Sequence, residues 1–158
     1  MIKIPYEDSD SSWFNCVGVH RGKQFMAFVT GASPWDPESA TTYFSPNEPG
    51  WEERKRWYGV IHLFEMNGDH FSTMAWLGGT TAQGRAESSA RAFEHIDAAV
   101  SAMEKPEFCD IYVNPFTYEV DEYLFGLLLE EDEDGEQHAM LWPNDIMFHS
   151  PWDGEYST

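Results

Sequence analysis

Residues 57–77, WYGVIHLFEMNGDHFSTMAWL, decide the fold that we expect for this chain. Two apolar runs flank Asn67-Gly68-Asp69, and Asn-Gly suits a tight turn that requires positive φ, so the stretch predicts a β-hairpin. Apolar side chains occupy both faces of the first arm, with Tyr58, Val60 and Phe64 on one face and Trp57, Ile61 and Leu63 on the other. A strand with this pattern is covered on both sides, which indicates an interior strand of a sheet.

The segment after the hairpin, residues 80–105, predicts one long helix. Thr80 and Gln83 have the T-x-x-Q spacing of a capping box at its start, and Pro106 ends it. Apolar residues that recur near helical spacing form the expected buried stripe: Ala82, Ala86, Phe93, Ile96, Val100 and Met103.

Further strands are expected on either side of the hairpin and helix, at residues 13–20, 24–30, 108–114, 116–120, 123–131 and 137–142. The pattern indicates an α+β fold, a single domain over residues 1–158 with a mostly antiparallel sheet of about six to eight strands. Because the helix joins two of the strands, one parallel crossover and hence a mixed sheet remain open.

Two loops and a repeated tetrapeptide complete the chain. Residues 31–50 contain four prolines and predict a long loop, and loops of this length are often functional. Residues 130–136, EEDEDGE, predict an acidic hairpin loop, because they lack the ligand order of an EF-hand. The tetrapeptide SPWD occurs at 33–36 and at 150–153. Proline restricts the backbone and tryptophan supplies an apolar anchor, so each copy predicts a rigid elbow held against the body.

Charge restricts the classes of partner. The chain carries 28 acidic and 9 basic residues, a formal net charge of −19. All nine bases lie in residues 1–105, whereas residues 106–158 hold 14 acids and no base. Such a polyanion repels phosphate backbones and anionic lipid surfaces, which argues against direct nucleic-acid or membrane binding. It attracts a basic protein, although the charge can also serve solubility alone.

The sequence shows no familiar catalytic or cofactor motif. It lacks a P-loop, a G-x-S-x-G elbow and paired metal-ligand spacings, and its two cysteines are far apart, so we expect no metal and no cofactor. An enzymatic alternative remains, a small hydrolase or metal-dependent enzyme, because imidazole and carboxylate groups serve acid–base and metal chemistry. Its candidate residues are His62, His70, Asp69, His149 and Asp153. These histidines can equally be core or surface residues with local hydrogen bonds.

Candidate partner-binding residues are aromatic, basic and acidic side chains of the predicted loops and the segment before the hairpin: Trp35, Tyr43, Trp51, Arg54, Arg56, Glu131, Asp132 and Asp134. Arginine and tryptophan are enriched at binding hot spots. The basic triplet 54–56 has two interpretations. It pairs with the acidic C-terminal third of the same chain, or it forms part of a recognition patch.

Two blocks carry a resemblance to a known family. WEERKRWYGVIHLFEMNGDH (51–70) and FHSPWDGEYST (148–158), with the helix and FGL between them, resemble small acidic bacterial proteins labelled formate hydrogenlyase regulatory protein or uncharacterised. The resemblance covers about half of the chain. It implies a bacterial cytosolic protein and brings no catalytic residues with it.

The leading hypothesis is therefore a non-enzymatic, cytoplasmic binding or regulatory protein that acts through a protein partner. Its sharpest form is an immunity-type protein that neutralises a basic toxin. The enzyme is one alternative, and a transcriptional regulator that acts without direct DNA contact is another. The oligomeric state is open.

Overall fold

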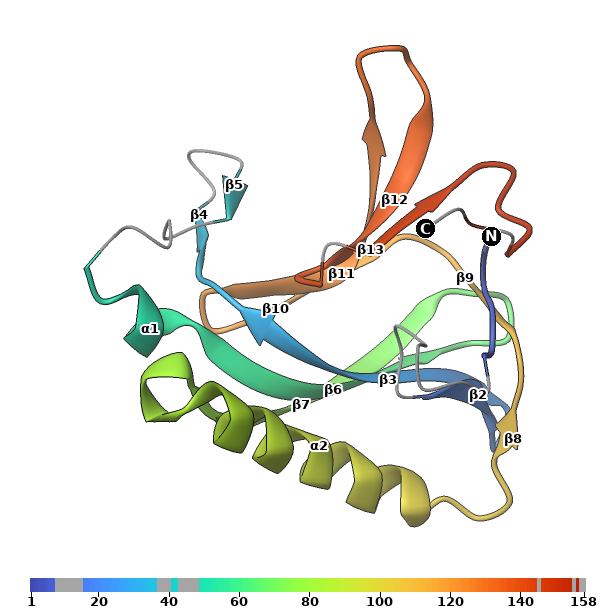
Figure 1. Ribbon diagram of the computed structural model, residues 1–158. Helices are drawn as coiled ribbons and strands as arrows, with labels where there is room; N and C mark the ends of the chain where they lie inside the picture. The colour runs from blue at the N-terminus through green and yellow to red at the C-terminus, as the bar shows by residue number, and fades with distance from the viewer. Residues whose placement is uncertain (8–15, 37–40, 43–48, 145, 155, 157–158) are drawn as a thin grey trace.

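The predicted hairpin forms two strands of a five-stranded antiparallel sheet (Figure 1). The structure is a computed structural model that describes residues 1–7, 16–36, 41–42, 49–144, 146–154 and 156. The strands of this sheet are β2 (Cys16–His20), β3 (Lys23–Ala32), β6 (Arg56–Phe64), β7 (His70–Thr80) and β8 (Glu107–Phe108). Their order across the sheet is β7-β6-β3-β2-β8.

The expectation for the first hairpin arm is confirmed. Strand β6 is an interior strand that pairs antiparallel with β3 on one side and β7 on the other. Tyr58, Val60 and Phe64 contribute to one buried cluster, and Ile61 and Leu63 pack into a second one. The strand is thus covered on both faces, and it carries side chains of both layers of the core.

The remaining strands do not extend this sheet, so the expectation of one sheet is wrong. The strands β10 (Phe116–Val120), β11 (Tyr123–Glu131), β12 (Gln137–Trp142) and β13 (Ile146–His149) form a second antiparallel sheet. Two shorter pairs are β1 (Ile2–Ile4) with β9 (Ile111–Val113) and β4 (Trp35–Asp36) with β5 (Thr41–Thr42). Every pairing among the described strands is antiparallel, so the fold is α+β with several antiparallel sheets.

The long helix is shorter than expected. Thr80 and Gln83 do form the capping box, but it caps a 3₁₀ turn, η1 (Thr81–Gln83). Gly84 follows with a φ of 109°, outside the helical region, so α2 begins only at the next residue (Arg85–Ser101). A four-residue helix, α1 (Trp51–Arg54), precedes β6. Within the part of the chain that the structure describes, neither helix is long and apolar enough to span a membrane.

The face that α2 buries matches the predicted stripe only in part. Ser88, Ala92 and Ile96 are buried, whereas Phe93 is 43% exposed. Small residues face the sheet because the helix backbone approaches it closely. A Cβ added at Gly59 on β6 would lie 2.3 Å from the carbonyl oxygen of Ala92. Close approach of the two backbones therefore accompanies the later part of the predicted stripe, whose Ile96, Val100 and Met103 do pack into the second cluster.

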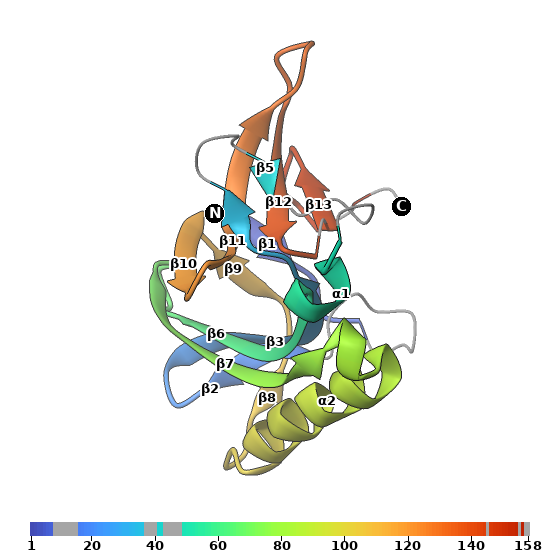
Figure 2. The same cartoon turned by 90° about the vertical axis from the view of Figure 1, so that its left-hand side faces the viewer.

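The larger core lies between the two main sheets. Figure 2 shows α2 against one face of the five-stranded sheet and β11–β13 beyond its other face. Phe28 of β3 and Phe125 of β11 belong to this core, and Trp152 and Tyr156 pack against it from the C-terminal segment. The hydroxyl of Tyr156 donates a hydrogen bond to the carbonyl of Lys3 at 2.7 Å. The second SPWD copy thus anchors its segment as predicted.

Candidate functional site

His62 and His70 lie on neighbouring strands and share one hydroxyl group. His62 pairs in register with Thr73 of β7, and its Nδ1 lies 2.7 Å from Thr73 Oγ1. The Nε2 of His70 lies 2.7 Å from the same oxygen. A threonine hydroxyl has one hydrogen to donate, so it donates to one imidazole and accepts an N–H from the other. The tautomers of the two rings are therefore coupled.

Burial makes both imidazoles harder to protonate. His62 is fully buried, and desolvation, together with the nearby His70, lowers its pKa to about 3. Desolvation also lowers the pKa of His70, and a hydrogen bond to the backbone of Ser72 partly offsets that effect. The Nε2 of His62 is buried and has no hydrogen-bond partner among the described residues. His62 is thus neutral near pH 7 and suited to packing.

The second sheet covers this pair through Phe116, the first residue of β10. The ring of Phe116 stacks on His70 with centroids 4.5 Å apart and meets the edge of His62 at 4.8 Å. It also contacts Phe64 at 5.2 Å. The two histidines therefore lie in the contact between the two sheets. This placement agrees with the interpretation of them as core residues with local hydrogen bonds.

The structure places the other candidate catalytic residues elsewhere. Asp69 closes the hairpin turn, where its Oδ1 accepts a hydrogen bond from Nδ2 of Asn114 at 3.0 Å. His149 is the last residue of β13 in the second sheet, and its Nδ1 donates to the carbonyl of Ser150 at 2.9 Å. Asp153 is exposed in the segment after β13.

The described side chains offer no shared metal site. Over these residues, no three or more His, Cys, Asp or Glu side chains are arranged to bind one metal ion. The structure brings His62 and His70 together, whereas Asp69 lies in the hairpin turn, His149 ends β13 and Asp153 follows it. The enzymatic alternative therefore rests on the pair His62 and His70, whose tautomers are coupled, and His62 is fully buried.

One member of the basic triplet, Arg56, pairs with the acidic C-terminal third, which is one of the two interpretations of the sequence. The Nη1 of Arg56 lies 3.3 Å from Asp121 Oδ2 and donates to the hydroxyl of Tyr58 at 3.1 Å. The guanidinium also lies over the ring of Tyr123, 4.6 Å from its centroid. Arg56 therefore joins the first sheet to the turn between β10 and β11. Arg54 is exposed at the end of α1.

The remaining partner-binding candidates fall into three groups. Trp51 is half-buried in α1. The side chain of Trp35 and the whole of Tyr43 lie outside the described residues, as does much of the loop 31–50. Glu131, Asp132 and Asp134 are exposed on the hairpin that joins β11 and β12.

The acidic hairpin projects away from the body of the molecule (Figure 1). Its loop is ordered by Asp132, whose Oδ1 accepts the backbone N–H groups of Asp134 and Glu136, each at 2.9 Å. The backbone N–H of Asp132 donates to the carbonyl of Glu136 at 2.9 Å. An acidic loop therefore joins β11 and β12, but it is shorter than the expected 130–136, because Glu130 and Glu131 belong to β11. One of its own carboxylates holds its conformation.

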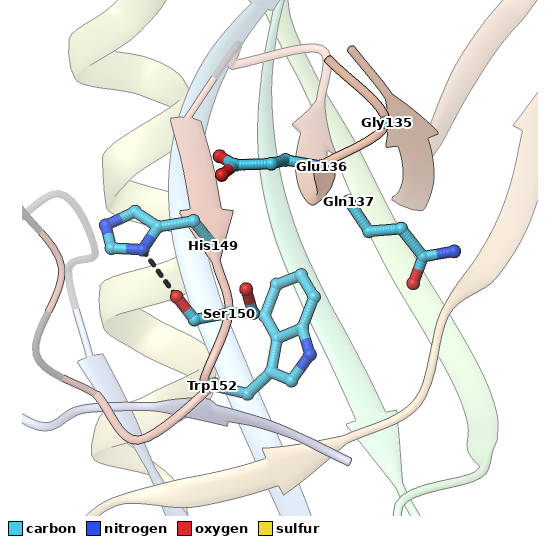
Figure 3. Close-up of a pocket in the computed structure, with 6 residues that line it drawn as sticks. All are labelled: Gly135, Glu136, Gln137, His149, Ser150 and Trp152. Carbon is cyan, nitrogen blue, oxygen red and sulfur yellow. Dashed lines mark hydrogen bonds between the residues drawn. The ribbon is translucent and has the colours of Figure 1, made fainter.

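A pocket of about 670 Å³ lies between this hairpin and the turn after β13 (Figure 3). Its lining residues are Gly135, Glu136, Gln137, His149, Ser150 and Trp152. The sequence reasoning singled out only His149 among them as a candidate site residue. The second SPWD was the available signal, because it places a tryptophan near His149, but nothing local indicates that the hairpin lies opposite.

Comparisons with known proteins return no match, neither to a protein-family model nor to a curated protein or a solved structure.

Proposed function

We propose that this protein is a non-enzymatic binding protein that recognises a basic protein partner through the β11–β12 hairpin. The observation that carries the proposal is the projecting end of this hairpin, residues 131–136, whose carboxylates are exposed in a segment of chain without bases. Its sharpest form is a cytoplasmic immunity-type protein that neutralises a basic toxin.

The ion pairs of the chain support the hairpin as the surface that contacts the partner. The bases Lys3, Arg21, Lys23 and Arg56 form ion pairs with carboxylates outside residues 131–136. The negative potential of the loop therefore extends into solvent, where it can steer a basic partner and raise the association rate. Catalysis receives no comparable support, because the coupled histidines are packed between the sheets.

The test compares two variants with the same loss of charge. One carries Glu131→Gln, Glu133→Gln and Asp134→Asn, which leaves the structural Asp132 in place. The matched control carries Glu87→Gln, Glu94→Gln and Asp97→Asn on the exposed face of α2. Proteins are captured on the immobilised wild type at low salt, eluted at roughly 1 M salt and identified, and their affinities are measured by calorimetry.

The expected partner is basic, and the hairpin variant binds it at least about tenfold more weakly while the α2 variant keeps most of its affinity. Equal losses in both variants would show that only net charge matters. A partner that stays bound at roughly 1 M salt would contradict the electrostatic argument.

A further inference from the structure

The pocket beside the hairpin has the chemistry to bind one organic cation. We propose that it receives an arginine side chain of the basic partner, an inference that rests on the proposed function and names the group recognised. Glu136 supplies an exposed carboxylate and Gln137 an amide at the start of β12. Trp152 supplies an aromatic surface from the other side. A guanidinium can bind a carboxylate and stack on an indole at the same time.

The arrangement of these groups suits a planar cation. Figure 3 shows the indole of Trp152 between His149 and Gln137, with the carboxylate of Glu136 on the His149 side. Lysine has a compact, strongly hydrated ammonium, whereas a guanidinium presents a flat face to the indole and parallel N–H groups to the carboxylate. An anion is disfavoured, because Glu136 lines the pocket and residues 106–158 contain no base.

Both walls of the pocket are held by their own hydrogen bonds. The backbone of Glu136 is fixed by the two bonds to Asp132 described above. Across the pocket, the backbone N–H of Trp152 donates to the backbone carbonyl of His149 at 3.2 Å. The Trp152 side chain packs partly against the core. A preformed site loses less conformational freedom on binding. The volume of about 670 Å³ lies within the usual range for ligand sites and admits the side chain with adjoining backbone.

The test uses N-acetyl-arginine amide and N-acetyl-lysine amide as probes in an NMR titration of the full chain at constant ionic strength. Arginine amide is expected to shift the amide signals of Gly135, Glu136 and Gln137 and the indole N–H of Trp152, and to bind at least about threefold more tightly than lysine amide. The variant Glu136→Gln should weaken arginine binding at least about fivefold. The matched variant Glu133→Gln removes the same charge from the loop outside the pocket and should change it less than about twofold.

Equal effects of Glu136→Gln and Glu133→Gln, or equal affinities for the two amides, would overturn the inference, because the loop would then act only as a charge. The outcome is separable from that of the proposed function. The amide probes need no protein partner, so their failure leaves the capture experiment standing. Conversely, a chain without a basic partner can still bind arginine amide in this pocket.

Discussion

Lowering the pH from about 7.5 to about 5 is expected to remove about 2 kcal/mol of stability through His62 alone. The pKa of His62 is about 3 in the folded protein, against an ordinary value of 6.5. Between these values the unfolded chain binds a proton that the folded chain excludes, so the free energy of unfolding falls as the pH falls. Each pH unit below 6.5 costs about 1.4 kcal/mol until the folded pKa is reached.

The measurement is urea denaturation of the wild type and two variants at both pH values. In His62→Asn an amide replaces the Nδ1 side of the ring and cannot ionise, so its stability should fall by about 2 kcal/mol less than that of the wild type. Thr73→Val removes the shared hydroxyl and should cost about 1–2 kcal/mol at either pH. This variant keeps the imidazole of His62, so the change in its free energy of unfolding between the two pH values should match that of the wild type.

All other groups are the same in the wild type and His62→Asn, so their contributions largely cancel in the comparison. If the wild type and His62→Asn lose the same stability between the two pH values, His62 is not excluded from protonation in the folded state. The argument from its burial would then be refuted, together with the assignment of the pair to the contact between the sheets.

Three further outcomes are expected. Gly59→Ala should lower the free energy of unfolding by about 3 kcal/mol, because its Cβ would meet the carbonyl of Ala92 at 2.3 Å; an unchanged urea midpoint would contradict the close packing of α2. Burial raises the pKa of the Cys16 thiol to about 11. Burial, Glu107 and Asp110 also raise the pKa of Cys109, but this thiol is less buried, so iodoacetamide at about pH 8 should label Cys109 first, as peptide mass mapping would show. Trp152→Ala should cost about 2 kcal/mol in thermal unfolding, since this side chain is only half-buried, and no loss would mean that it anchors nothing.

Local signals in the sequence predicted the elements bounded by clear turns. The expected strands 116–120, 123–131 and 137–142 coincide with β10, β11 and β12. They are separated by Asp121-Glu122 and by the acidic loop, whose composition indicates turns without reference to the rest of the chain. Helix α2 was found for the same reason, but its start was misplaced because a capping box also fits a 3₁₀ turn.

Strand partners and the grouping into sheets could not be predicted in this way. Alternation shows that both faces of β6 are buried but does not say which strands cover them. Residues 108–114 looked like one strand, yet the chain divides into β8, which pairs with β2, and β9, which pairs with β1. These pairings join residues far apart in the sequence, where no short pattern specifies the partner.

The candidate site shows the same limit. Thr73 is one threonine among several, and its role follows from the register that sets it opposite His62. In the sequence, Phe116 has the pattern of an ordinary strand residue. Its contact with His70 follows from the packing of the second sheet on the first. Glu136 and Trp152 come together only when β12 and β13 pair, since His138 then lies opposite His149.

The pairing of β1 with β9 has a consequence for the order of events during synthesis. Ile2 lies opposite Val113, so the ribosome adds about 110 residues before the partner of β1 exists. Translation at about 5–20 residues per second leaves this apolar strand waiting for roughly 5–20 s. The bond from Tyr156 to Lys3 forms later still. Ile2 and Ile4 can therefore complete their packing in the core between the sheets only after β9 has been made.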